Sequence, residues 1–117
     1  MKISRGDVFL VEVVFSDRSG AKLRPALILS GSAYNRDRQE VIIAAITSNV
    51  DRLLPGDTKI SDWKAAGLKL PSVLTAIVQT VKKSLLQKRL GTLSAADFTR
   101  AEPALHSALG FKAGPKS

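Results

Sequence analysis

The sequence DVFLVEVVF at residues 7–15 is apolar on both faces of the strand that it predicts, and only Glu12 interrupts it. A strand that is covered on both sides belongs in a small barrel or a sandwich, because an open sheet leaves alternate side chains in water. Three aliphatic runs follow, and each predicts a further strand: residues 25–30 (PALILS), 40–47 (EVIIAAIT) and 72–81 (SVLTAIVQTV).

The segments between these strands predict shorter elements. Residues 31–38 are loop-like with room for one helical turn, residues 58–60 form a short strand, and a helical turn from Asp62 ends at Gly67. Pro25 lacks a backbone N–H, so we expect it to open its strand rather than lie in the middle of a ladder.

The C-terminal region predicts the one long helix. Ser94 is a natural N-cap, and Asp97 three residues later completes a capping-box-like pair. Pro103 is expected to kink or split this helix, Gly110 to end it, and Phe111 to fold back onto the core. The apolar positions at helical spacing are Phe98, Ala101, Leu105, Ala108 and Leu109.

Strands followed by a terminal helix predict a small α+β domain with a compact antiparallel barrel, short helical insertions and a C-terminal helix. A chain of 117 residues has room for one domain, which we place at residues 1–117, with a frayed tail at 112–117.

Composition excludes several classes of site. The chain has no cysteine, which excludes a disulfide scaffold, a thiolate metal site and a cysteine nucleophile. His106 is its one histidine, which excludes a two-histidine metal site and leaves little room for a serine–histidine triad. No apolar run is long enough to cross a membrane, and the first residues do not resemble a secretory signal. We therefore expect a cytoplasmic protein that needs no metal and no cofactor.

The charge is uneven along the chain. The net charge is +8, with +1 in residues 1–58 and +7 in residues 59–117. A basic excess of this size favours a polyanion or an acidic protein partner, although a merely soluble basic surface is an alternative.

Two strand ends place polar side chains next to apolar strands. Arg24 stands at a strand entrance, and Thr47, Ser48 and Asn49 stand where another strand leaves the core. If the two strands pair, Arg24 and Thr47 meet at one end of the sheet, where an arginine fork and a hydroxyl can bind one phosphate. The alternative is an ordinary polar strand end, which is more common.

Three motifs in register resemble the MazF/PemK/Kid family of toxin endoribonucleases. These are RGDV at residues 5–8, KLRPALILS at residues 22–30 and AITS at residues 45–48, and the likeness extends over residues 4–111. The resemblance implies a homodimer of SH3-like barrels that cleaves single-stranded RNA without metal, leaving a 2′,3′-cyclic phosphate and a 5′-hydroxyl. It also implies a cognate acidic antitoxin, whose tail would cover the basic groove.

The resemblance also implies residue roles. Arg24 matches the family's catalytic arginine, which stabilises the pentavalent phosphate, and Thr47 matches its catalytic threonine or serine. Ser48 and Asn49 beside them, and Arg18 and Lys22 in the loop that would flank the groove, are expected to bind substrate.

One departure concerns the last long strand. Many members carry an Asp-Gln-x-Arg-Thr element there, whereas this chain has AIVQT at residues 76–80. The aspartate's acid–base role therefore cannot be transferred. Gln79 and Lys82 are expected to supply polar or phosphate contacts instead, with a solvated basic turn as the alternative.

Two other functions stay open at this stage. The same barrel occurs in CcdB-like toxins, which bind DNA gyrase and do not cut RNA, although such a binder does not need the pair Arg24 and Thr47. The missing aspartate also leaves room for a catalytically inactive RNA-binding module.

Overall fold

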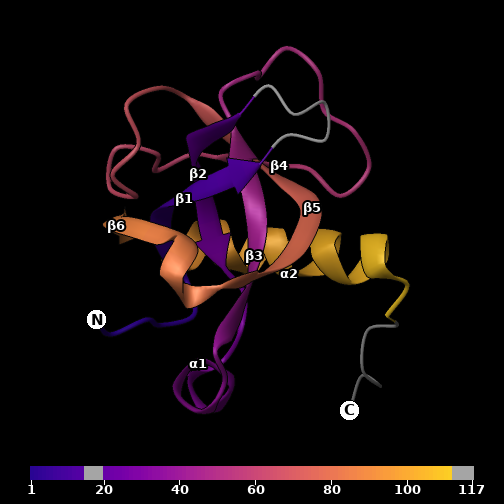
Figure 1. Ribbon diagram of the computed structural model, residues 1–117. Helices are drawn as coiled ribbons and strands as arrows, with labels where there is room; N and C mark the ends of the chain where they lie inside the picture. The colour runs from indigo at the N-terminus through magenta and orange to yellow at the C-terminus, as the bar shows by residue number, and fades with distance from the viewer. Residues whose placement is uncertain (15–19, 112–117) are drawn as a thin grey trace.

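The computed structural model describes residues 1–14 and 20–111, and within them six antiparallel strands form one curled sheet in the order β4-β5-β3-β2-β1-β6 (Figure 1). The helix α2 runs across one side of this sheet, and α1 projects beyond the end of β2 and the start of β3 (Figure 1). No helix in the described part of the chain is long and apolar enough to span a membrane. The elements are β1 (Asp7–Val14), β2 (Ala21–Ile28), α1 (Ser32–Asp37), β3 (Glu40–Thr47), β4 (Thr58–Ile60), β5 (Ser72–Lys82), the 3₁₀ helix η1 (Lys83–Leu85), β6 (Leu86–Thr92) and α2 (Ala95–Leu109).

The two faces of the sheet carry two separate apolar clusters, and β1 contributes to both. Val8 belongs to the cluster under α2, whereas Phe9 and Val11 belong to the cluster on the opposite face, called the second cluster below. All three residues are fully buried. Because successive side chains of a strand point to opposite faces, this arrangement explains why residues 7–15 are apolar on both faces.

A backbone contact closes the gap between the two edge strands. β4 and β6 are the edges of the sheet, and the turn after β4 comes back against β6. Gly67 in this turn has φ +81°, and a Cβ there would lie 2.0 Å from the carbonyl oxygen of Leu90. A Cβ at Gly91 would likewise lie 2.6 Å from the carbonyl carbon of Ala66. Two glycines therefore let the curled sheet close on itself.

Most expected elements are present, but Pro25 does not open its strand. β2 begins four residues earlier at Ala21, and Pro25 pairs with Leu10 of β1. Pairing with β3 begins only at Ala26, so one side of β2 is still unpaired at Pro25, where a proline is tolerated.

The expectations for the C-terminal helix were partly wrong. α2 is continuous from Ala95 to Leu109 and is not split at Pro103. Leu105, beyond the proline, is buried against the sheet, and this packing holds the second half of the helix in place. Phe111 is 66% exposed and makes an edge contact with His106 instead of returning to the core. The Phe111 N–H donates to the carbonyl of His106 beyond the Gly110 cap, which fixes this position.

We expected residues 1–117 to form one domain, and this stays a prediction, since the tail at 112–117 lies outside the described residues.

Asp97 fastens α2 to the turn after β4. Its backbone N–H donates to Ser94 Oγ at 3.1 Å, as the capping pattern predicts. Its buried carboxylate accepts the backbone N–H groups of Ser61 (3.0 Å) and Asp62 (2.9 Å) and pairs with Arg100. Burial acts to raise the pKa of Asp97, but the hydrogen bonds from Asp62, Ser61, Arg100 and Ser94 together outweigh it and lower this pKa.

Asp97→Asn is expected to lower the free energy of unfolding at neutral pH by roughly 2–4 kcal/mol, because an amide cannot accept both N–H groups and the ion pair is lost. The lowered pKa means that the carboxylate stabilises the fold above its unfolded-state pKa of about 3.9 and loses this effect as the pH falls through the folded-state pKa. Urea unfolding of both proteins should therefore show a difference that shrinks in acid.

Asp62→Asn is the matched control, because the Asp62 side chain is exposed and only its backbone N–H contacts Asp97. A difference between Asp97→Asn and the wild type that stayed constant from neutral to acidic pH would contradict the role of the charge.

Candidate active site

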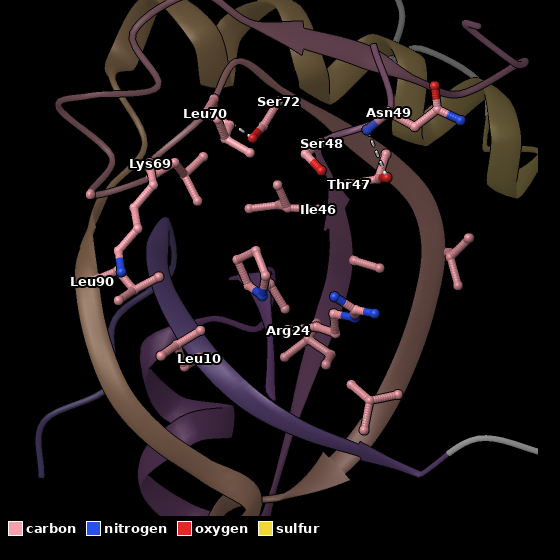
Figure 2. A pocket seen from close by; sticks show the side chains of 18 of the residues that line it. Leu10, Arg24, Ile46, Thr47, Ser48, Asn49, Lys69, Leu70, Ser72 and Leu90 are labelled. Carbon is pink, nitrogen blue, oxygen red and sulfur yellow. Dashed lines mark hydrogen bonds between the residues drawn. The ribbon is translucent and has the colours of Figure 1, made fainter. Parts of the chain in front are cut away.

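A cavity of about 880 Å³ opens at the end of the sheet where β2 and β3 leave the second apolar cluster (Figure 2). β1, β2, β3, β5, β6, residues 48–49 and the segment 67–70 form its walls. Its apolar lining residues are Leu10, Val13, Pro25, Ala26, Ile43, Ala45, Ile46, Leu68, Leu70, Ile77 and Leu90. The others are Arg24, Thr47, Ser48, Asn49, Gly67, Lys69, Ser72 and Gln79.

The strand register brings Arg24 and Thr47 to this cavity. Ala26 pairs with Ala45, so continuing the same register by two residues places Arg24 opposite Thr47. Arg24 shares a strand face with Ala26 and Ile28, which are buried in the second cluster. This row of side chains on one face of β2 therefore runs from the core into the cavity, and the exposed Arg24 side chain is its last member. Both residues line the cavity, as the sequence predicted from the pairing of the two strands.

The end of β3 is held by a local turn. Thr47 Oγ1 accepts the backbone N–H of Asn49 at 3.1 Å (Figure 2). Asn49 Oδ1 accepts in turn the N–H of Asp51 at 3.3 Å. The Thr47 oxygen is thus used as an acceptor, and its O–H remains available to donate to a ligand.

The electrostatics of the cavity favour an anion. Arg24 makes no hydrogen bond or ion pair with another described residue, and neither an aspartate nor a glutamate is among the described residues of the lining. A guanidinium offers two parallel N–H donors, which match the oxygens of a phosphate. Together with the Thr47 hydroxyl, the cavity presents several donors to one anionic group.

The other predicted site residues differ in whether they line the cavity. Ser48, Asn49 and Gln79 line the cavity. Lys22 is exposed on β2 opposite Val13 and does not line it.

Lys82 is also outside the cavity, and Arg18 lies outside the described residues. Lys82 pairs with Glu40 at the start of β3, whereas Thr47 is at the end of that strand. The antiparallel pairing of β5 therefore carries Lys82 away from Thr47, and the structure does not support a contact between Lys82 and this site.

Sequence reasoning missed Lys69 and Ile77 as cavity residues. Ile77 is 60% exposed and faces the cavity from β5, where period-2 alternation with Gln79 would have indicated a shared face. Lys69 follows the glycine turn and belongs to no periodic pattern.

The described residues contain no group of three or more histidine, cysteine, aspartate or glutamate side chains that could hold a metal ion. His106 lies on α2 and does not line this cavity.

The chain is similar to known proteins over most of its length. Residues 4–109 match the family described as the PemK-like, MazF-like toxin of type II toxin–antitoxin systems. The chain is 30% identical over 112 residues to an endoribonuclease MazF of Staphylococcus epidermidis, with 92% of each chain covered.

Two solved structures from Mycobacterial species have the same fold. An endoribonuclease superimposes with a TM-score of 0.78 at 24% identity, covering 97% of this chain and 96% of that one. An endoribonuclease in complex with its cognate antitoxin has a TM-score of 0.74 at 26% identity, covering 95% and 98%. These likenesses confirm the predicted α+β class with its curled antiparallel sheet and C-terminal helix.

Proposed function

The chain belongs to the PemK-like, MazF-like toxins of type II toxin–antitoxin systems, and we propose that it is an endoribonuclease that cleaves single-stranded RNA in the cavity of Arg24 and Thr47. The observation that carries this proposal is the convergence of these two side chains in a cavity with no described carboxylate in its lining. An anionic substrate is favoured there, and a protonated guanidinium keeps its charge at any physiological pH.

The proposed reaction is a transfer within the RNA itself. The 2′-oxygen attacks the adjacent phosphorus, the bond from phosphorus to the 5′-oxygen breaks, and a cyclic phosphate forms. The 2′-hydroxyl loses a proton and the leaving 5′-oxygen gains one, so the step consumes no co-reactant. Arg24 donates two hydrogen bonds to the phosphate oxygens as negative charge builds on them, and the Thr47 O–H donates a third. Ser48, Asn49 and Gln79 supply further donors and acceptors for the bases and riboses at the rim.

The deciding experiment incubates the purified protein with single-stranded RNA in EDTA and identifies the ends of the products. Cyclic-phosphate and 5′-hydroxyl ends are expected. RNA that is bound but not cut would favour an inactive RNA-binding module, and inhibition of DNA supercoiling without RNA cleavage would favour a gyrase inhibitor. Either result would reject the proposal.

Thr47→Ala is expected to slow cleavage roughly 10- to 150-fold, since one hydrogen bond to a charged group contributes about 1.5–3 kcal/mol. Thr47→Ser should keep most of the activity, because the serine hydroxyl can both accept the Asn49 N–H and donate to the phosphate. Single-turnover rates on a labelled oligonucleotide would measure both variants. Equal rates for the alanine and serine variants would show that the hydroxyl has no part in the reaction.

We also propose that the protein forms a homodimer, acts in the cytoplasm and is inhibited by an acidic antitoxin. The complex of a similar endoribonuclease with its cognate antitoxin and the net charge of +8 support the last of these. Such a complex should weaken as salt rises, and a dissociation constant independent of salt would contradict an electrostatic contact. Analytical ultracentrifugation and cell fractionation would test the dimer and the location.

A further inference from the structure

Lys69 lies on the wall of the cavity opposite Arg24 (Figure 2). Its side chain is exposed, and it makes no ion pair or hydrogen bond with another described residue. Arg24 and Lys69 are the two cations among the described residues of the lining. The residues that β5 contributes to the lining are uncharged. The cavity thus has a positive charge on each of two walls.

The backbone on both sides of Lys69 is fixed by contacts of its neighbours. Gly67 packs against the backbone of Leu90, and Leu68 is buried in the cluster under α2. The carbonyl of Leu70 accepts a hydrogen bond from Ser72 Oγ at 2.8 Å. Lys69 therefore projects from an anchored segment, which lowers the entropy cost of placing its ammonium group.

Apart from its two cations, the lining is largely apolar, and Leu10, Pro25 and Leu90 contribute to it. A ligand that fits this pattern carries two anionic groups joined by a less polar unit. The backbone of RNA has this alternation, because each nucleoside stands between two phosphates. With Arg24 at the cleaved phosphate, the cation on the opposite wall is available to a second phosphate of the same strand.

We propose that Lys69 binds a phosphate adjacent to the cleaved one, so that the cavity holds a phosphate–nucleoside–phosphate unit. This proposal rests on the function proposed above. Lys69 is a substrate-binding residue in this scheme, whereas Arg24 and Thr47 act on the reacting phosphate.

The first test compares Lys69→Gln with Lys64→Gln. Lys64 has the same charge, is exposed in the neighbouring turn against Trp63, and does not line the cavity. At low salt, Lys69→Gln is expected to lower kcat/KM for a short single-stranded RNA by about 5- to 10-fold, mainly through KM. The slope of log kcat/KM against log salt should also fall by about 0.7, the value for one lost phosphate contact on a single strand. Lys64→Gln should change kcat/KM less than the Lys69 variant does.

The second test removes the charge from the RNA instead. A single methylphosphonate is placed one linkage to the 5′ side or one linkage to the 3′ side of the cleaved bond. With the wild type, one of these two positions is expected to lower kcat/KM by about the same factor as Lys69→Gln. With Lys69→Gln, that methylphosphonate should have no further effect, because its partner is already absent.

Failure of this proposal is distinguishable from failure of the proposed function. If the wild type cuts RNA and needs Arg24, but Lys69→Gln behaves as Lys64→Gln does, Lys69 has no such role. The proposal is also overturned if each methylphosphonate has the same effect on the wild type and on Lys69→Gln. If the wild type does not cut RNA at all, both proposals fall together.

Discussion

Arg24→Ala is expected to slow RNA cleavage by roughly a thousandfold, which corresponds to about 4 kcal/mol of lost transition-state stabilisation. The reason is that Arg24 supplies the paired donors for the charge that develops on the phosphate, in a cavity where no other described arginine is present. Arg24→Lys keeps the charge but loses the fork, so an intermediate rate is expected. Single-turnover cleavage of a labelled oligonucleotide would measure both variants.

The control for Arg24→Ala is Arg36→Ala. Arg36 is an exposed arginine on α1 that pairs with its neighbour Asp37 and does not line the cavity. Arg36→Ala removes the same charge from the protein, so the comparison corrects for weaker long-range attraction of RNA. Arg24 is exposed, and its substitution should leave the melting temperature nearly unchanged. A rate for Arg24→Ala close to that of Arg36→Ala would show that the chemistry lies elsewhere.

The part of the site that could be predicted from sequence is the part that regular strands build. Arg24 and Thr47 lie at the ends of two neighbouring apolar runs, and antiparallel pairing of consecutive strands is the common case. The register then has only to place Ala26 opposite Ala45 for the two side chains to meet. The two-faced apolar pattern of β1 likewise predicted the buried strand of a closed sheet.

Lys82 shows where this reasoning ends. The residue lies in the same strand as Gln79, and regular alternation places two side chains that are three residues apart on opposite faces. How far each residue lies from Thr47 along the sheet is a separate question. The pairing of β3 with β5 contains an irregularity between Ala44 and Ile46, so the position at which β5 passes Thr47 cannot be derived by counting residues. Only the structure shows that Gln79 reaches the cavity and Lys82 does not.

Lys69 could not be predicted for a different reason. Its place depends on a contact between Gly67 and Leu90, which are far apart in the sequence and show no shared pattern. Such closures of irregular segments by backbone contact leave no periodic signal. Glycine permits the positive φ of Gly67, but a glycine in the sequence does not by itself predict a positive φ.

Gly67 is also where the largest effect on stability is expected. The residue has φ +81°, a conformation that costs an L-residue about 1–2 kcal/mol. An added Cβ would also lie 2.0 Å from the oxygen and 2.5 Å from the carbon of the Leu90 carbonyl. Both atoms belong to backbone, so no side-chain rotation can relieve the overlap, and the turn must move away from β6. Such a movement would open the sheet between its two edge strands and shift the segment that holds Lys69.

Gly67→Ala is therefore expected to lower the free energy of unfolding by roughly 3–5 kcal/mol, and the melting temperature by about 15–30 °C. Two glycines serve as controls that separate the causes. Gly110→Ala has a similar φ of +80° with nothing within 4 Å of the new Cβ, so it measures the backbone conformation alone. Gly31→Ala has φ −77° and open space, so it measures the substitution without either cost. Thermal and urea unfolding should rank Gly67→Ala well below Gly110→Ala, and Gly110→Ala below Gly31→Ala. A cost for Gly67→Ala no greater than that for Gly110→Ala would mean that the contact with β6 does not close the sheet.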